Sequence, residues 1–100
     1  MRVCVVYPGI GGKGFHSIGQ GMDSGWISHG VAILTACARE AGHDAALIDL
    51  RALRGWEHLR QELATRDPEV VAVSMMSVDF DPALRTLEIA REVCPQAVTM

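Results

Sequence analysis

Short, mainly apolar runs alternate along this chain with longer segments that mix apolar and polar positions. Residues 2–7 contain Val-Cys-Val-Val, which is typical of a strand buried on both faces. Residues 45–50 and 70–74 are similar runs and predict a second and a third strand, and residues 97–100 predict the start of a fourth.

Two of the intervening segments carry apolar residues at helical spacing. Residues 27–41 form a broad stripe of apolar and small side chains that ends at Gly42, so this helix is expected to be deeply buried. Residues 56–65 turn Trp56, Leu59 and Leu63 inward, and this helix ends before Pro68.

A third helix is expected to run to about Val93, with Asp81 as its N-cap and Pro82 in its first turn. Strands that alternate with helices predict an α/β protein. We expect a Rossmann-like, flavodoxin-like parallel sheet of about four strands, with right-handed crossovers and helices on both faces. Because doubly wound domains usually have about five strands or more, residues 1–100 are expected to be a truncated part of a longer domain, or else a short domain that completes its sheet by pairing with another chain.

The composition narrows the class of protein. Hydrophobic residues make up 49% of the 100 residues, which is enough for a packed core. The net charge of −3 and the lack of a basic run argue against nucleic-acid binding. No apolar run is long enough for a membrane span and no signal peptide is visible. Cys4, Cys37 and Cys94 are interpreted as buried thiols in a reducing cytoplasm, with no spacing typical of a metal site.

Residues 8–25 contain seven of the ten glycines and follow the first strand directly. Residues 9–14 fit G-x-G-x-x-G, the spacing of a dinucleotide-binding turn. That turn needs a helix to begin within it, and no helical pattern begins there; Asp49, at the end of the second strand, is 35 residues beyond Gly14. We therefore interpret the segment as a glycine-rich flap over the ligand edge of the sheet, with Lys13 as a contact, or else as a solvated loop.

Three segments resemble a known family in their order and spacing. They are the small-residue helix, Gly-His and strand-ending Asp of Ser28 to Leu50, the third strand Asp67 to Ser77, and the helix and strand of Ile89 to Met100. Together they resemble the N-terminal cobalamin-binding domain of cobalamin-dependent radical S-adenosylmethionine enzymes. The resemblance covers most of the chain.

The resemblance implies that the carboxyl ends of the strands hold cobalamin, a corrinoid, with Ser74 and Ser77 beside its nucleotide tail. Met75 and Met76 would offer adaptable apolar surface, although alternation along a strand would put one of them in the core. Asp49 is expected either to accept a hydrogen bond from a corrin side chain or to cap a loop. The expected cofactor-binding residues are Pro8, Gly9, Gly11, Gly12, Ser28, His29, Asp49, Ser74, Met75, Met76 and Ser77.

The sequence departs from the family's pattern in two places. Pro8-Gly9-Ile10 stands where some relatives have Asp-x-His-x-x-G, so no cobalt ligand is assigned, and His16 in the flap is a weak alternative. The Cys-x-x-x-Cys-x-x-Cys that holds an iron–sulfur cluster is absent. S-adenosylmethionine and a 4Fe-4S cluster are therefore expected only in the rest of the polypeptide, and this segment is expected to bind a corrinoid without catalysing a reaction alone.

Two other functions stay open at this point. One is a nucleotide- or flavin-binding domain of a Rossmann-type oxidoreductase. The other is a receiver-like signalling domain, which needs an acidic pair after the first strand and an Asp after the third. Tyr7-Pro8 and Ser74-Met75 stand at those places, so this alternative ranks last.

Overall fold

Strands and helices alternate along the whole described part of the chain. The computed structural model describes residues 1–10, 14–15 and 29–100. The elements are β1 (Arg2–Tyr7), α1 (His29–Glu40), β2 (Asp44–Asp49), the 3-10 turn η1 (Leu50–Ala52), α2 (Trp56–Arg66), β3 (Val70–Val73), the 3-10 turn η2 (Ser77–Asp79), α3 (Phe80–Val93) and β4 (Val98–Thr99). The predicted order of elements is therefore confirmed.

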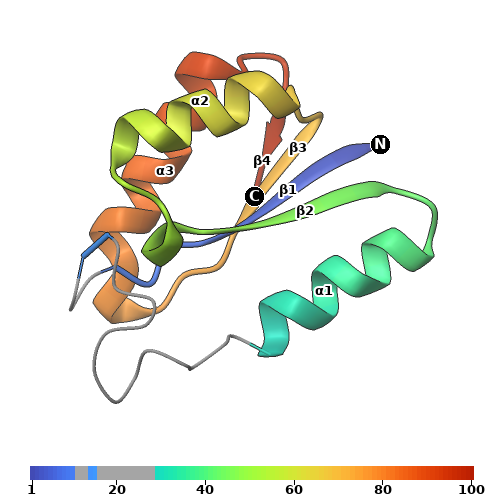
Figure 1. The fold of residues 1–100 in the computed structure, drawn as a ribbon, viewed down its shortest axis with the longest axis horizontal. Helices are drawn as coiled ribbons and strands as arrows, with labels where there is room; N and C mark the ends of the chain where they lie inside the picture. Colours follow the sequence, from blue (N-terminus) through green and yellow to red (C-terminus); the bar gives the residue numbers. More distant parts are fainter. Residues whose placement is uncertain (11–13, 16–28) are drawn as a thin grey trace.

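The four strands form one parallel sheet in the order β2-β1-β3-β4 (Figure 1). β1 lies inside the sheet and pairs with β2 along its whole length, so that Arg2 faces Asp44 and Tyr7 faces Asp49. On its other side β1 pairs with β3. The chain leaves β1 toward one side and later returns to its other side, so the topological switch point lies between β1 and β3. The α/β, flavodoxin-like class is confirmed.

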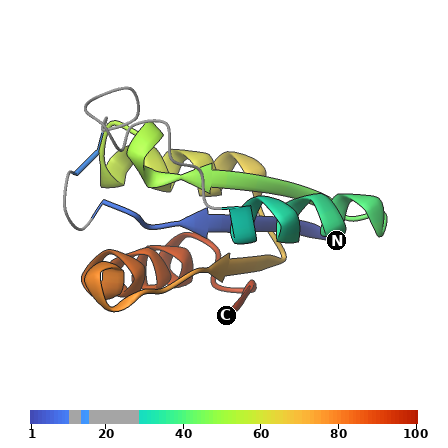
Figure 2. The ribbon, with the colours of Figure 1, turned by 90° about the horizontal axis from the view of Figure 1, so that it is seen from below.

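Helices cover both faces of the sheet, but unequally. α2 and α3 pack side by side on one face and α1 lies on the other (Figures 1 and 2). The main core lies between the sheet and the α2–α3 layer. Its buried members are Cys4, Val6, Ile48, Leu50, Leu53, Leu59, Leu63, Val71, Ile89, Ala90 and Cys94.

The expectation that α1 is deeply buried is wrong. Ile33 and Leu34 are 61% and 64% exposed, whereas Val31 and Thr35 are buried. α1 packs on β1 and β2, and within the described residues no second helix lies beside it on that face, so only one narrow stripe of α1 meets the sheet. Cys37 is exposed for the same reason, which corrects the prediction of three buried thiols; Cys4 and Cys94 are buried as predicted.

The third helix begins earlier than the sequence suggested. Its N-cap position is held by Asp79 and not by Asp81, because η2 runs directly into α3 at Phe80. Pro82 is then the third helical residue, where its missing N–H is not needed for the helix. The Pro82 carbonyl accepts a hydrogen bond from Thr86 Oγ1 at 2.8 Å.

A matched pair of leucines tests this distribution of core and surface. Leu63→Ala removes a fully buried side chain and should lower the free energy of unfolding by about 2–5 kcal/mol. Leu34→Ala, in the exposed part of α1, should change it by less than about 0.5 kcal/mol. Urea unfolding followed by circular dichroism measures both, and equal losses would contradict the structure.

Candidate functional site

The carboxyl ends of β1, β2 and β3 lie side by side at one edge of the sheet, which we call the carboxyl edge (Figure 1). Tyr7 and Asp49 are register partners at this edge. The Ser74 N–H donates to the Val6 carbonyl at 3.2 Å, so the segment after β3 starts alongside β1. Three of the segments expected to hold a ligand, around Pro8, Asp49 and Ser74, therefore meet at the carboxyl edge.

The expected site residues differ in how they are presented there. Pro8 is buried, while Gly9 and Ser74 are half-buried. Met75 and Met76 are 49% and 59% exposed, so the expectation that one of them lies in the core is wrong. β3 ends at Val73, and the alternation of faces that applies within a strand no longer applies to them.

Of the remaining expected residues, some are described by the structure and others lie outside the described ranges. Ser77 is exposed at the start of η2. His29 is the first residue of α1. Gly11, Gly12 and Ser28 lie outside the described residues, as do Lys13, His16 and most of the proposed flap over residues 8–25.

The described part of the glycine-rich segment is held near the carboxyl edge. The Gly14 N–H donates to the Ile10 carbonyl at 2.9 Å, with Gly14 at a φ of 79°, a conformation that glycine adopts without strain. The Phe15 ring meets the Trp56 ring edge to face, with the centroids 5.1 Å apart. Residues 14–15 are thus attached to the start of α2.

Asp49 and Arg51 form a tight ion pair just beyond β2. Asp49 Oδ1 accepts the backbone N–H of Arg51 at 3.0 Å and Nε–H at 3.1 Å, and Oδ2 accepts from Nη2 at 2.7 Å. Asp49 therefore caps η1, the second of its two expected roles; its contact with a ligand stays a prediction. The hydrogen bond to Asp49 is the main cause that raises the pKa of Arg51, so the guanidinium stays charged.

Tyr7 joins this pair to the strand beside it. The Arg51 guanidinium carbon lies 4.9 Å from the centre of the Tyr7 ring, within cation–π range. Gly9 approaches the same ring so closely that a Cβ there would lie 2.5 Å from Tyr7 Cε1. Burial raises the pKa of Tyr7; Arg51 lowers it, and the carboxylates of Asp79 and Asp49 raise it further.

Sequence reasoning missed Tyr7, Arg51 and Asp79 as members of the carboxyl edge. Asp79 is only 4% exposed, and its carboxylate makes no capping hydrogen bond to α3. The available signal was the spacing Asp-x-Arg at the end of an apolar strand, which places a cation within reach of the strand-ending carboxylate. That Tyr7 would lie under this cation depends on the pairing of β1 with β2.

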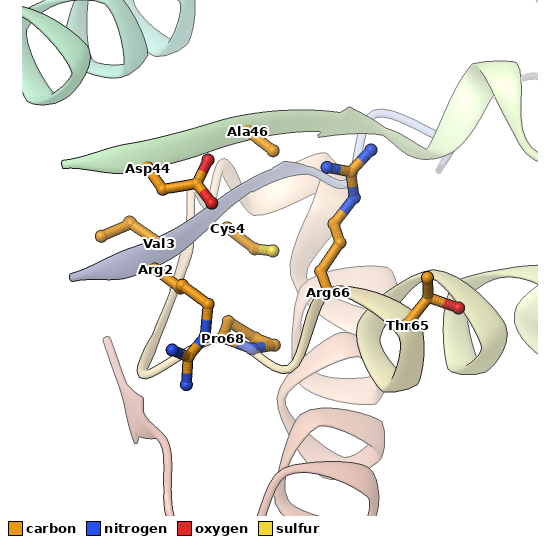
Figure 3. Close-up of a pocket in the computed structure, with 8 residues that line it drawn as sticks. All are labelled: Arg2, Val3, Cys4, Asp44, Ala46, Thr65, Arg66 and Pro68. Atoms are coloured by element: carbon orange, nitrogen blue, oxygen red, sulfur yellow. The ribbon is translucent and has the colours of Figure 1, made fainter.

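A pocket at the opposite, amino-terminal edge of the sheet has a different character. Its volume is about 230 Å³, and it is lined by residues from the starts of β1 and β2, from the end of α2 and from the approach to β3 (Figure 3). Arg2 has ion partners in Asp67 and Glu69, and Arg66 has one in Glu62. Cys4 contributes its thiol, and burial raises the pKa of that thiol to about 11. The cations of this pocket are already matched by carboxylates of the chain.

Among the described residues no group of three or more His, Cys, Asp or Glu side chains is arranged to hold a metal ion. None of the helices described is long and apolar enough to cross a membrane.

The sheet and the helices together define an open flavodoxin-like α/β domain, with the carboxyl edge at its topological switch point. The chain is 29% identical, over 106 aligned positions that include all of it, to the anaerobic magnesium-protoporphyrin IX monomethyl ester cyclase of Rubrivivax gelatinosus. It spans 18% of the length of that enzyme. No model of a known protein family matches the chain. No solved structure matches it either.

The close approach of Gly9 to Tyr7 predicts a specific coupling. Gly9→Ala should lower the free energy of unfolding by about 1–3 kcal/mol, because the new methyl group displaces the Tyr7 ring from Arg51. In a Tyr7→Ala background the same change should have little effect, since the obstacle is gone. A double-mutant cycle of urea unfolding measures the coupling. An equal loss in both backgrounds would show that the ring is not the obstacle.

The buried Cys4 thiol predicts a pH dependence of stability. Its pKa lies near 9.0 when the chain is unfolded and near 11 when it is folded. The unfolded state therefore releases the proton first, and the free energy of unfolding should fall as the pH rises from about 9 to about 11. Cys4→Ala should make this fall less steep in denaturation under reducing conditions. Identical slopes for the two proteins would contradict the prediction.

Proposed function

We propose that this chain is the cobalamin-binding domain of a cobalamin-dependent radical S-adenosylmethionine enzyme. In that proposal residues 1–100 form a Rossmann-like domain, and another part of the polypeptide carries the radical chemistry. The domain itself binds and positions the corrinoid.

The observation that carries the proposal is the pair of exposed methionines at the switch point. Met75 and Met76 lie two and three residues beyond the end of β3 and leave large flexible apolar side chains open at the carboxyl edge. Exposed apolar surface at a ligand edge favours a ligand with a broad apolar face, which a corrin ring provides. Phosphate groups, by contrast, need backbone N–H groups at the start of a helix.

The sequence similarity supports the same proposal. The resemblance found in the sequence is to cobalamin-dependent radical enzymes, among which we expect a methyltransferase or a cyclase. All 100 residues of this chain align with part of a protein that is named as a cyclase. Cobalamin would supply a methyl group or take part in a radical step in such an enzyme.

The side chains at the carboxyl edge have a chemistry that suits contact with this cofactor. Pro8 and Gly9 would lie beneath the ring, and Met75 and Met76 would contact its apolar face. Ser74 and Ser77, with small hydroxyl side chains, would hydrogen-bond the nucleotide tail and leave room for it. Asp49 would act through Arg51, with which it is paired.

A dinucleotide-binding function receives less support from the same edge. α1 begins only at His29, 15 residues after Gly14, so the motif does not open a helix whose N-terminus could meet a pyrophosphate. A receiver function lacks its phosphorylated Asp, because Ser74 follows β3.

Corrinoid binding is testable on the chain itself. Titration with hydroxocobalamin should quench the tryptophan fluorescence in a saturable way, with about one corrinoid bound per chain. Replacing both Met75 and Met76 with Glu should raise the Kd about tenfold or more, because apolar contact worth about 1.5 kcal/mol is lost.

Val98→Glu is the matched control, since Val98 is an exposed apolar residue whose register partner is Val70, the first residue of β3, at the opposite end of that strand from the methionines. This variant should bind hydroxocobalamin like the unchanged chain. NAD and riboflavin phosphate are titrated in parallel. Saturable binding of either of them, without binding of the corrinoid by a folded chain, would overturn the proposed function.

A further inference from the structure

The guanidinium of Arg51 has more hydrogen-bond donors than the described chain uses. A guanidinium has five N–H donors, and Asp49 accepts from Nε and from Nη2. Both hydrogens of Nη1 and the second hydrogen of Nη2 have no acceptor in the described ranges. The Arg51 side chain as a whole is only 10% exposed. Buried donors without acceptors are costly and rare in proteins.

These donors lie at the carboxyl edge. Arg51 lies two residues beyond the end of β2, and its guanidinium is held over the ring of Tyr7, the last residue of β1. The two hydrogen bonds to Asp49 fix the plane of the guanidinium, so its remaining donors keep a defined direction. The ligand expected at this edge would therefore meet a preorganised set of donors.

The charges around Arg51 indicate what kind of acceptor fits. Asp49 already neutralises the guanidinium. The buried carboxylate of Asp79 is near enough to contribute to the raised pKa of Tyr7, so among the described residues carboxylates outnumber cations around the ring. A phosphate or carboxylate ligand would add another negative charge to this surrounding. A neutral carbonyl oxygen accepts the same hydrogen bonds without that penalty.

We propose that Arg51, held by Asp49 against Tyr7, is a binding residue that donates hydrogen bonds to the carbonyl oxygen of a neutral carboxamide group on the ligand. This inference rests on the proposed function, since the edge of a corrin ring carries several carboxamide side chains. It assigns the ligand contact to Arg51, which the sequence did not single out, and makes Asp49 its positioning residue.

The test compares two corrinoids on the unchanged chain and on variants. Cobinamide keeps the carboxamides and lacks the nucleotide tail, whereas cobyrinic acid has carboxylates in place of the carboxamides. The unchanged chain should bind cobinamide at least about tenfold more tightly than cobyrinic acid, by fluorescence titration at constant ionic strength. Arg51→Met should raise the Kd for cobinamide by about tenfold and reduce the preference between the two corrinoids.

Two further variants keep the test decisive. Arg51→Lys retains the charge beside Asp49 but not the fork of donors, so it should fold and still lose most of the preference, even if Arg51→Met does not fold. Arg66→Met is the control, because Arg66 is also paired with a carboxylate, that of Glu62, but in a more exposed pair at the opposite edge of the sheet. It should leave both Kd values unchanged.

The outcomes distinguish a failure of the proposed role of Arg51 from a failure of corrinoid binding itself. If the unchanged chain binds cobinamide and folded Arg51→Lys has the same Kd values and the same preference, the role of Arg51 is overturned and corrinoid binding stands. If the folded unchanged chain binds neither cobinamide nor hydroxocobalamin, the proposed function fails, and the inference fails with it.

Discussion

The position of β1 inside the sheet is the constraint on which the rest of this structure depends. β1 is hydrogen-bonded to β2 on one side and to β3 on the other, and its buried apolar residues contribute to the packing on both faces. This double pairing brings the ends of three strands to one edge, although their residues are far apart in the sequence. Tyr7, Asp49 and Ser74 are neighbours only because β1 pairs with both strands.

Ion pairs differ in burial between the two ends of the sheet, and this difference distinguishes the proposed ligand-binding end from the other. At the amino-terminal edge, the exposed side chains of Arg2 and Arg66 are paired with exposed or half-buried carboxylates of the chain, and such surface pairs contribute little to stability. At the carboxyl edge, Arg51 is withdrawn from water and paired with Asp49. Burying an ion pair carries a desolvation penalty that the attraction between its charges only partly offsets. A buried pair is therefore easier to explain where the charged side chain also binds a ligand.

Exposed apolar side chains also occur in two separate places on the domain. Met75 and Met76 are exposed at the carboxyl edge, where the proposed ligand would cover them. Ile33 and Leu34 are exposed on α1, on the face of the sheet that holds a single helix in the described part of the chain. The first pair belongs to the proposed site, whereas the second pair reflects how few elements share a face with α1.

The sequence by itself determined the alternation of strands and helices, the parallel α/β class and the edge at which a ligand is expected, because periodicity and glycine or proline boundaries are local properties. It also placed Asp49 at the end of β2. Only the tertiary structure decided that α1 is largely exposed, that both methionines are open, and that Tyr7, Arg51 and Asp49 form one cluster. Burial and cross-strand contact depend on which elements become neighbours, and no local pattern of residues encodes that.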